Sequence, residues 1–170
     1  MTAKPDFESL VERHSGELFS YLWRLLGSEA DASDCLQETF LRAFRAYEWV
    51  RDFSNLRAWL YKIATNAART HLSRDHRRQS RSEPLLEPVA SGEKAVDLQV
   101  AERTQLAAVK QAVMALPERQ RAALMMRKYQ ELEYAEIAAA LNCSEDAARA
   151  NVYQALKKLR ELFANEVNDE

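Results

Sequence analysis

The sequence predicts an all-α protein with two small helical domains. Strong helix formers, chiefly Ala, Leu, Glu, Arg and Gln, dominate the chain, and alternating Val, Ile and Thr runs typical of strands are absent. Only three glycines and four prolines occur, and Pro84, Pro88 and Gly92 fall in one short stretch. Because almost nothing elsewhere interrupts a helix, that stretch indicates a domain boundary.

The first of three helices expected in an N-terminal domain, residues 1–80, spans residues 6–26. Its apolar side chains repeat along one stripe, and Gly27 ends it. His14 falls within the stripe and has no second metal ligand or nucleophile at a partner spacing. We therefore expect His14 to be a packed, hydrogen-bonded residue of the core.

The second and third helices are both expected to be amphipathic. Ser28 and Asp31 resemble a capping box for the second helix, whose apolar residues repeat at intervals of four, four and three: Leu36, Phe40, Phe44 and Tyr47. The third helix begins near Asn55 and continues to about Arg81. It carries an inward stripe of Leu56, Leu60, Ile63 and Ala67.

Residues 81–97, "RSEPLLEPVASGEKAVD", lose the helical period and gain Pro, Gly, Ser and acidic residues. This composition is typical of a flexible linker. A C-terminal domain, residues 98–170, is expected to contain four helices, at residues 98–115, 117–128, 134–141 and 144–163. The last two are joined by Asn142 and Cys143, which is the spacing of a helix-turn-helix.

The charge distribution indicates nucleic-acid binding although the net charge is −2. Residues 69–81 carry five basic groups and one acidic group, and residues 149–160 carry four basic groups and none that is acidic. Each basic stretch falls within an expected helix. Two local surfaces of positive charge are therefore predicted, one in each domain.

Several other classes of protein are not favoured by the sequence. No apolar run approaches the about 18 residues that a membrane helix needs, and residues 1–6 lack the regions of a signal peptide, so we expect a cytoplasmic location. Cys35 and Cys143 are far apart and lack a CxxC pattern, so we expect neither a disulfide nor a metal. An enzyme with a cofactor is not expected, because His71 and His76 have no partner at a catalytic or metal spacing and no glycine-rich phosphate loop occurs.

The expected recognition helix carries side chains suited to major-groove binding. Its outward residues include Arg149, Ala150, Asn151 and Gln154, and Arg, Asn and Gln can each make paired hydrogen bonds to base edges. Lys157 and Lys158 follow at positions near phosphates, and Tyr134 on the preceding helix completes this set. Acidic residues at the start of the helix predict weak binding by this module alone. The alternative is a surface helix with a solvated charged face.

The third helix carries a second candidate surface opposite its apolar stripe. Residues spaced by three and four place an aromatic ring, an amide and cations on one face: Trp59, Lys62, Asn66 and Arg69. Such a set fits unstacked bases and a phosphate backbone, as in opened DNA, and Arg74 extends the cationic track. The alternative is that Trp59 belongs to the core and the arginines form a solvated helix end.

The chain resembles the extracytoplasmic-function group of sigma factors over nearly its whole length. "DASDCLQETFLRAF", residues 31–44, is similar to the helix that grips the coiled coil of the largest polymerase subunit. "RAWLYKIATNAARTHLSRDHRR", residues 57–78, looks like the segment that opens and reads the minus-ten element. "ALPERQRAALMMRKYQELEYAEIAAALNCSEDAARANVYQALKKLR", residues 115–160, resembles the region that reads the minus-thirty-five element. Thr70 departs from the family pattern, as does the stretch 145–148.

This resemblance implies particular roles for particular residues. The polymerase-facing residues would be Asp31, Asp34, Gln37, Glu38, Thr39 and Arg42. The minus-ten contacts would come from the loop and the third helix: Arg51, Phe53, Asn55, Trp59, Lys62, Asn66, Arg69 and Arg74. The minus-thirty-five contacts would be Tyr134, Arg149, Ala150, Asn151, Gln154, Lys157 and Lys158.

The function implied is that of a sigma factor, which binds core RNA polymerase and directs promoter recognition and transcription initiation. Its implied partners are core polymerase, promoter DNA and an anti-sigma protein, with no cofactor or small-molecule substrate. The alternative is a helix-turn-helix regulator with an N-terminal ligand or dimerisation domain. A plain regulator needs only the C-terminal motif, whereas the sigma interpretation also accounts for the acidic second helix and the basic, aromatic third helix.

Overall fold

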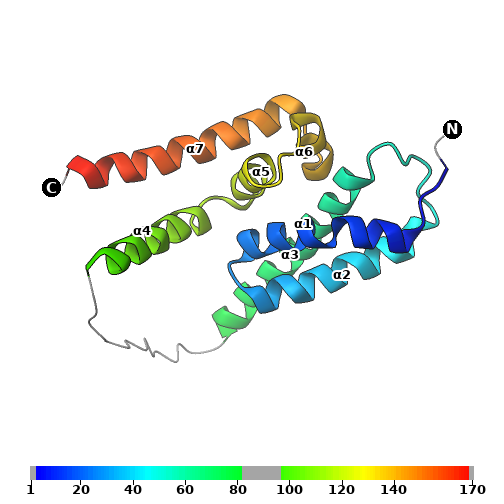
Figure 1. The fold of residues 1–170 in the computed structure, drawn as a ribbon, viewed down its shortest axis with the longest axis horizontal. Helices are drawn as coiled ribbons and strands as arrows, with labels where there is room; N and C mark the ends of the chain where they lie inside the picture. Colours follow the sequence, from blue (N-terminus) through cyan, green and yellow to red (C-terminus); the bar gives the residue numbers. More distant parts are fainter. Residues whose placement is uncertain (1–2, 82–96, 169–170) are drawn as a thin grey trace.

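The computed structural model describes residues 3–81 and 97–168 and contains only helices and connecting loops in those ranges (Figure 1). Its helices are α1 (Phe7–Leu26), α2 (Glu29–Tyr47), α3 (Leu56–Arg81), α4 (Asp97–Met114), α5 (Glu118–Lys128), α6 (Tyr134–Leu141) and α7 (Glu145–Asn168). The all-α prediction is confirmed. Within these ranges, no helix combines the length and apolar character needed to cross a bilayer. Most of the expected linker, residues 82–96, lies outside the described residues.

Local signals at the helix ends account for most of the boundaries. Gly27 adopts φ 73° after α1, a left-handed conformation that suits glycine because it has no Cβ atom. The Ser28 side chain accepts a hydrogen bond from the Asp31 amide and caps α2. Pro117 directly precedes α5 instead of beginning it. Helix α7 continues to Asn168, past the expected end at residue 163, because no Gly or Pro interrupts it.

The N-terminal domain packs α1, α2 and α3 around a shared core. Leu18 and Leu22 of α1 and Leu60 of α3 are fully buried. Tyr21 packs edge-on against Tyr61, with 5.1 Å between the ring centroids. His14 is buried and pairs with Glu17 through its Nδ1 atom, so the prediction of a packed, hydrogen-bonded histidine is confirmed.

The predicted apolar stripe of α2 is confirmed for Leu36, Phe40 and Tyr47, which lie in or against the core, and is wrong for Phe44. The fully or nearly fully buried face of α2 differs from this stripe. Its core-facing residues are mostly small: Ala32, Cys35, Thr39, Ala43 and Tyr47. In the predicted stripe Tyr47 is buried, Leu36 and Phe40 are half-buried, and Phe44 is 65% exposed. The large residues lie one position along from the true core face. Small residues there let α1 and α3 approach α2 closely.

The C-terminal domain contains the predicted helix-turn-helix. Asn142 takes a left-handed conformation with φ 52° after α6, and the Ser144 hydroxyl accepts a hydrogen bond from the Ala147 amide at 3.1 Å before α7. Ile137 of α6 and Ala148 of α7 are fully buried where the two helices meet. A small residue at this crossing lets the second helix of the motif pack tightly on the first.

The two domains pack against one another, a feature that the sequence did not indicate. Helix α6 lies against α3, and α5 lies against α1 (Figure 1). The buried apolar residues of both domains belong to one contiguous cluster. At its edge, Arg57 of α3 donates to a Glu17 carboxylate oxygen at 2.7 Å and to the Gln130 carbonyl oxygen at 2.6 Å. Arg57 therefore links α1, α3 and the C-terminal domain.

Glu17 is ionised within this polar cluster. Burial raises its pKa, but hydrogen bonds with His14 and Arg57, together with the charge of Arg57, lower it more, to about 2. The Tyr61 hydroxyl also donates to Glu17 at 3.1 Å. The carboxylate is thus held charged at the junction of three helices.

Replacing Leu60 with Ala should lower the free energy of unfolding by about 2 to 5 kcal/mol, since a fully buried side chain is lost and a cavity remains. Urea unfolding followed by circular dichroism measures this change. The matched control is Leu41→Ala, because Leu41 is 53% exposed and its replacement should change stability by less than about 0.5 kcal/mol. Equal effects of the two substitutions would contradict the described core.

Glu17→Gln should remove a pH-dependent part of the stability. A carboxyl group with a lowered folded pKa contributes stability above its unfolded pKa of 4.5, and that stability is lost as pH falls through about 2. At pH 7 the variant should therefore unfold at lower urea concentration than the wild type, and the difference should shrink between pH 4.5 and pH 2. Glu12→Gln, at an exposed position of α1, is the control. A constant difference across this pH range would rule out the described role.

Candidate nucleic-acid interfaces

One face of α2 combines carboxylates with exposed apolar side chains. Asp34 is exposed, and Glu38 is half-buried and accepts a hydrogen bond from Arg42 at 2.6 Å. Leu41 and Phe44 are 53% and 65% exposed on the same helix. Neither residue was predicted as a surface group: Phe44 was assigned to the apolar stripe, and Leu41 was assigned no role. We call Asp34, Gln37, Glu38, Leu41 and Phe44 the α2 face.

Thr39 does not lie on the α2 face, so its prediction as a polymerase-facing residue is wrong. Its side chain is fully buried, and its hydroxyl donates to the Cys35 carbonyl oxygen at 2.6 Å. Threonine can satisfy its hydroxyl in this way inside a helix and still occupy a core position. The other predicted residues of α2 have at least partly exposed side chains: Asp31, Asp34, Gln37, Glu38 and Arg42.

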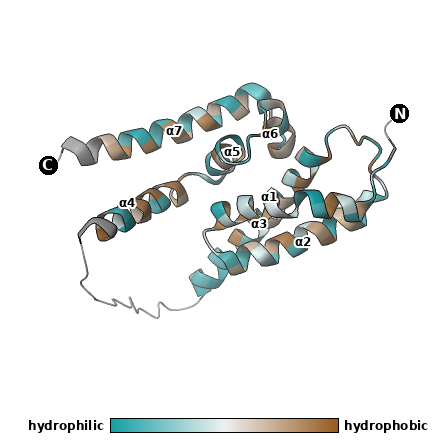
Figure 2. Ribbon diagram, in the orientation of Figure 1, coloured by the Kyte–Doolittle hydropathy of each residue, from teal (hydrophilic) through white to brown (hydrophobic). Residues whose placement is uncertain are grey.

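The predicted basic face of α3 is present, but Trp59 is not an exposed part of it. Lys62, Asn66 and Arg69 are all exposed and recur at helical spacing. Trp59 is half-buried, and its ring lies 6.1 Å from that of Tyr47. The alternative interpretation, in which Trp59 packs on the core, therefore holds for much of this side chain. Towards its C-terminal end, α3 becomes hydrophilic (Figure 2).

The loop before α3 holds one predicted residue in a structural role. The Asn55 side-chain oxygen accepts the Ala58 amide at 3.2 Å, which caps the helix. Phe53 is half-buried with its ring 6.5 Å from that of Tyr47, whereas Arg51 is exposed. Trp49 is 75% exposed beside this loop, an aromatic surface residue absent from the predicted set.

The basic face of α3 is turned towards the C-terminal domain. Arg69 forms an ion pair with Glu118 of α5 at 2.9 Å. Lys62, Asn66 and Arg69 line a small cavity together with Arg119 and Asn142 of the C-terminal domain. Since α6 lies beside α3, this packing limits the access of a DNA strand to the face.

The recognition helix α7 presents most of its predicted contacts to solvent. Arg149, Gln154 and Lys157 are exposed, as are Ala150 and Lys158. The Arg149 guanidinium lies 4.5 Å from the centre of the Tyr134 ring and 3.4 Å from a Glu145 carboxylate oxygen. Stacking on Tyr134 restricts Arg149 to few orientations, which favours a specific hydrogen-bonding role.

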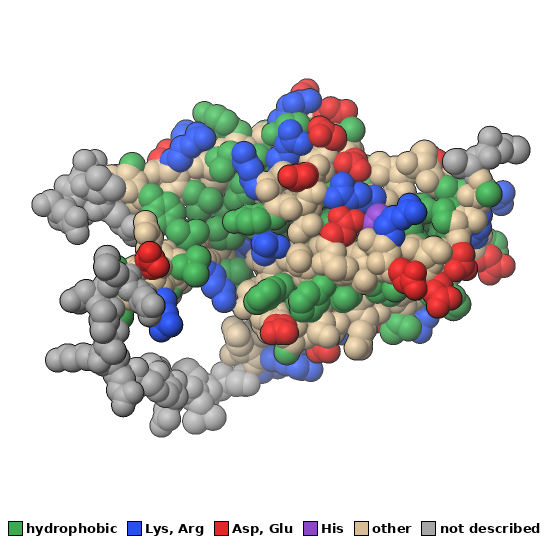
Figure 3. All heavy atoms as spheres, viewed as in Figure 1, with side chains coloured by type: hydrophobic (Ala, Val, Ile, Leu, Met, Phe, Trp, Pro, Cys, Tyr) green, Lys and Arg blue, Asp and Glu red, His purple; other side chains and the backbone are tan. Residues whose placement is uncertain are grey.

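Two features of α7 oppose strong DNA binding by this predicted recognition helix. Asn151 is half-buried and its side-chain amide donates to the Ala147 carbonyl oxygen at 2.9 Å, so one of its donors is already used. Glu145 competes for Arg149. On the face drawn in Figure 3, acidic side chains are interspersed with basic ones near α6 and α7. This arrangement fits weak binding by the isolated motif.

Cys35 and His71 lie close to the α2 face, and their surroundings bear on their chemistry. Burial, and then the charges of Asp31 and Asp34, raise the pKa of the Cys35 thiol to about 11, which leaves it protonated at neutral pH.

The prediction that His71 has no partner at a metal spacing is wrong. Its Nε2 atom lies 3.2 Å from a carboxylate oxygen of Asp31 and 3.2 Å from one of Asp75. One partner comes from another helix, which sequence spacing does not show.

Two protein-family models match the chain on either side of the expected linker. Sigma-70 region 2 matches residues 10–78, and sigma-70 region 4 matches residues 106–159. The two matches together cover both expected DNA-binding helices. They also fall on the domains that carry the α2 face and the recognition helix.

Comparisons with whole proteins agree with these matches. The chain is 32% identical to the RNA polymerase sigma-H factor of Pseudomonas aeruginosa, over 89% of this chain and 83% of that protein. It is 31% identical to the ECF RNA polymerase sigma-E factor of Salmonella typhimurium, over 95% and 86% of the two chains. Its fold is similar to the sigma factor RpoE of Bartonella quintana, solved in complex with the anti-sigma factor NepR, with a TM-score of 0.71, 24% identity and coverage of 94% and 97%. On sequence and fold together, the chain belongs to the extracytoplasmic-function group of the sigma-70 family of RNA polymerase sigma factors.

Proposed function

We propose that this sigma factor binds core RNA polymerase through the α2 face. The observation that carries the assignment is the exposure of Leu41 and Phe44, at 53% and 65%, on the same face of α2 as the carboxylates of Asp34 and Glu38. Apolar groups rimmed by charges are typical of a surface that is covered by a protein partner. Asp34 and Glu38 would then complement basic groups on the polymerase and set the orientation of docking.

Promoter recognition in this proposal requires the two domains to separate. Asn66 and Arg69 are the α3 residues proposed for the minus-ten element, and both line the contact with the C-terminal domain. Polymerase binding would supply the free energy to release the Arg69 pair with Glu118 and to hold the domains on separate stretches of DNA. The exposed cations would then contact phosphates while Asn66 reads an unstacked base.

The helix-turn-helix is proposed to read the minus-thirty-five element. Arg149 and Gln154 can make paired hydrogen bonds to guanine and adenine edges in the major groove. Lys157 and Lys158 would contact the phosphate backbone and fix the register of the helix. The Glu145 carboxylate has to give up Arg149 for the base contact, which is one reason that the isolated domain would bind weakly.

In the proposed function, RNA polymerase supplies the catalysis and an anti-sigma protein supplies the regulation. The sigma factor has no catalytic role of its own in this scheme, and polymerase makes the transcript. We also propose a cytoplasmic location, because core polymerase acts there, and inhibition by an anti-sigma protein that covers the α2 face. The alternative of a helix-turn-helix regulator needs an N-terminal ligand or dimerisation domain, and that part of the chain matches sigma-70 region 2 instead.

The double substitution Asp34→Ala, Glu38→Ala should weaken binding to purified core polymerase at least about tenfold, since two charges at the docking surface are lost. Fluorescence anisotropy of the labelled full-length chain measures the affinity, and circular dichroism checks that helix content is kept. Glu12→Ala on α1 is the matched control. Unchanged affinity of the double variant would move the docking surface elsewhere, and a wild-type chain that fails to join core polymerase would contradict the proposed function.

Arg149→Ala in the holoenzyme should cost about 1 to 3 kcal/mol of binding free energy at one base position of the minus-thirty-five element, because a paired contact is lost. The measurement compares the holoenzyme's affinities for selected promoter DNA and for its single-base variants. Lys157→Ala should instead weaken binding by a similar factor for every sequence, as a phosphate contact does. A uniform loss for Arg149→Ala would assign this residue to the backbone.

A further inference from the structure

A cluster of potential metal ligands joins the beginning of α2 to the later part of α3. The His71 Nε2 atom lies 3.2 Å from Asp31 Oδ1 and 3.2 Å from Asp75 Oδ2. One ligand atom from each of the three side chains lies within 4.8 Å of the others. This is the one such group of three or more among the described residues. Asp75 follows His71 by one helical turn, and Asp31 comes from the first turn of α2.

The imidazole nitrogen in this cluster is buried but makes no hydrogen bond. His71 Nε2 has less than 1 Å² of accessible surface, and neither carboxylate is placed to form a hydrogen bond with it despite the short distances. A buried nitrogen between two carboxylate oxygens requires either a proton or a metal ion between them. The poor hydrogen-bond geometry favours the metal ion.

The distances fit a small tetrahedral ion. Zinc binds histidine nitrogen at about 2.0 to 2.1 Å and carboxylate oxygen at about 2.0 to 2.2 Å, so two ligand atoms of a tetrahedral site lie about 3.3 to 3.5 Å apart. Both nitrogen-to-oxygen distances, at 3.2 Å, are close to this value. The two carboxylate oxygens lie within 4.8 Å of one another. Three protein ligands leave a fourth position for water or a partner's side chain.

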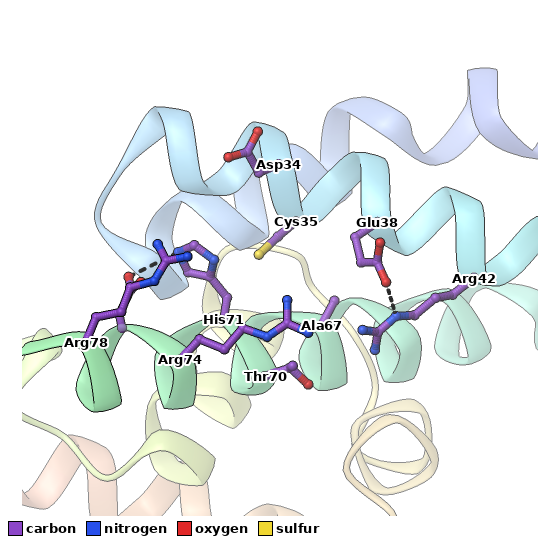
Figure 4. Close-up of a pocket in the computed structure, with 10 residues that line it drawn as sticks. Asp34, Cys35, Glu38, Arg42, Ala67, Thr70, His71, Arg74 and Arg78 are labelled. Atoms are coloured by element: carbon purple, nitrogen blue, oxygen red, sulfur yellow. Dashed lines mark hydrogen bonds and ion pairs between the residues drawn. The ribbon is translucent and has the colours of Figure 1, made fainter. Parts of the chain in front are cut away.

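The surroundings favour a transition metal over magnesium or calcium. The adjoining pocket is lined by Arg74 and Arg78 as well as by acidic residues, so its charge alone does not concentrate cations strongly. An imidazole ligand selects zinc and its neighbours, whereas magnesium and calcium prefer oxygen ligands alone. Figure 4 shows Cys35 and His71 on opposite walls of this pocket, on α2 and α3. We propose that Asp31, His71 and Asp75 bind a divalent transition-metal ion such as Zn²⁺.

Metal binding at this position would cross-link two helices that have different proposed functions. An ion bound by Asp31 and His71 links α2, the proposed polymerase-binding helix, to α3, the proposed minus-ten helix. Asp31 itself was predicted to face polymerase, so the ion and the polymerase would share one carboxylate. This consequence rests on the proposed function, whereas the existence of the metal site does not.

The test is a Zn²⁺ titration of the purified, metal-free, full-length chain by calorimetry, with Co²⁺ as a spectroscopic probe. We expect one equivalent to bind, with visible Co²⁺ absorption of tetrahedral intensity. His71→Gln should weaken binding at least about tenfold, as should Asp31→Asn and Asp75→Asn. His76→Gln, at an exposed position of α3, and Cys35→Ser should bind like the wild type.

Thermal unfolding provides a second measurement that separates metal binding from folding. The wild-type unfolding temperature should rise with Zn²⁺ concentration, because the ion binds the folded chain, and that of His71→Gln should not. The proposal is overturned if the wild type binds no Zn²⁺ or if His71→Gln binds it unchanged. It is equally overturned if Cys35→Ser or His76→Gln is the variant that abolishes binding. None of these outcomes depends on polymerase.

Discussion

Arg57, held by its ion pair with Glu17, is the side chain that joins the two domains at the polar edge of their contact. Half-buried ion pairs are stabilising only when further hydrogen bonds compensate the lost hydration of both groups. Here Glu17 also accepts from Tyr61 and pairs with His14, while Arg57 donates a second bond to the Gln130 carbonyl oxygen. Because Arg57 lies in the first turn of α3, the same side chain positions that helix and anchors the C-terminal domain.

This closed arrangement explains how a chain with net charge −2 can contain two basic helices, the ones proposed to bind DNA, without exposing a strong positive surface. Arg69 is paired with Glu118 across the domain contact, and Arg149 is paired with Glu145 along α7. Each pair is exposed enough to be weak, so either can exchange its carboxylate for a phosphate or a base at small cost. In the proposed function, binding that is weak in the free chain would become specific once polymerase separates and holds both domains.

Features set by local sequence could be predicted, whereas features set by distant residues could not. Gly27 and Ser28 mark helix ends through their own backbone and hydroxyl chemistry, so the boundaries were close to those observed. The exposed cations of α3 and α7 also followed from helical spacing. Thr39 was misplaced because burial of a polar residue depends on the two helices packed against it. His71 was misjudged because Asp31, its partner from α2, is 40 residues away in the sequence.

The exposure of Phe44, the one residue of the predicted α2 stripe that does not lie in or against the core, bears on function. Phe44 follows the small core residue Ala43 by one position, so a helix that packs through Ala43 turns Phe44 partly towards solvent. Phe44 stays 65% exposed although its ring contacts Phe7, with 5.3 Å between the ring centroids. Tertiary packing thus selects Ala32 and Ala43 for the core and leaves Leu41 and Phe44 outside it. Two exposed apolar side chains beside the carboxylates of Asp34 and Glu38 are typical of a surface that a protein partner covers, which is why the α2 face is the proposed polymerase contact.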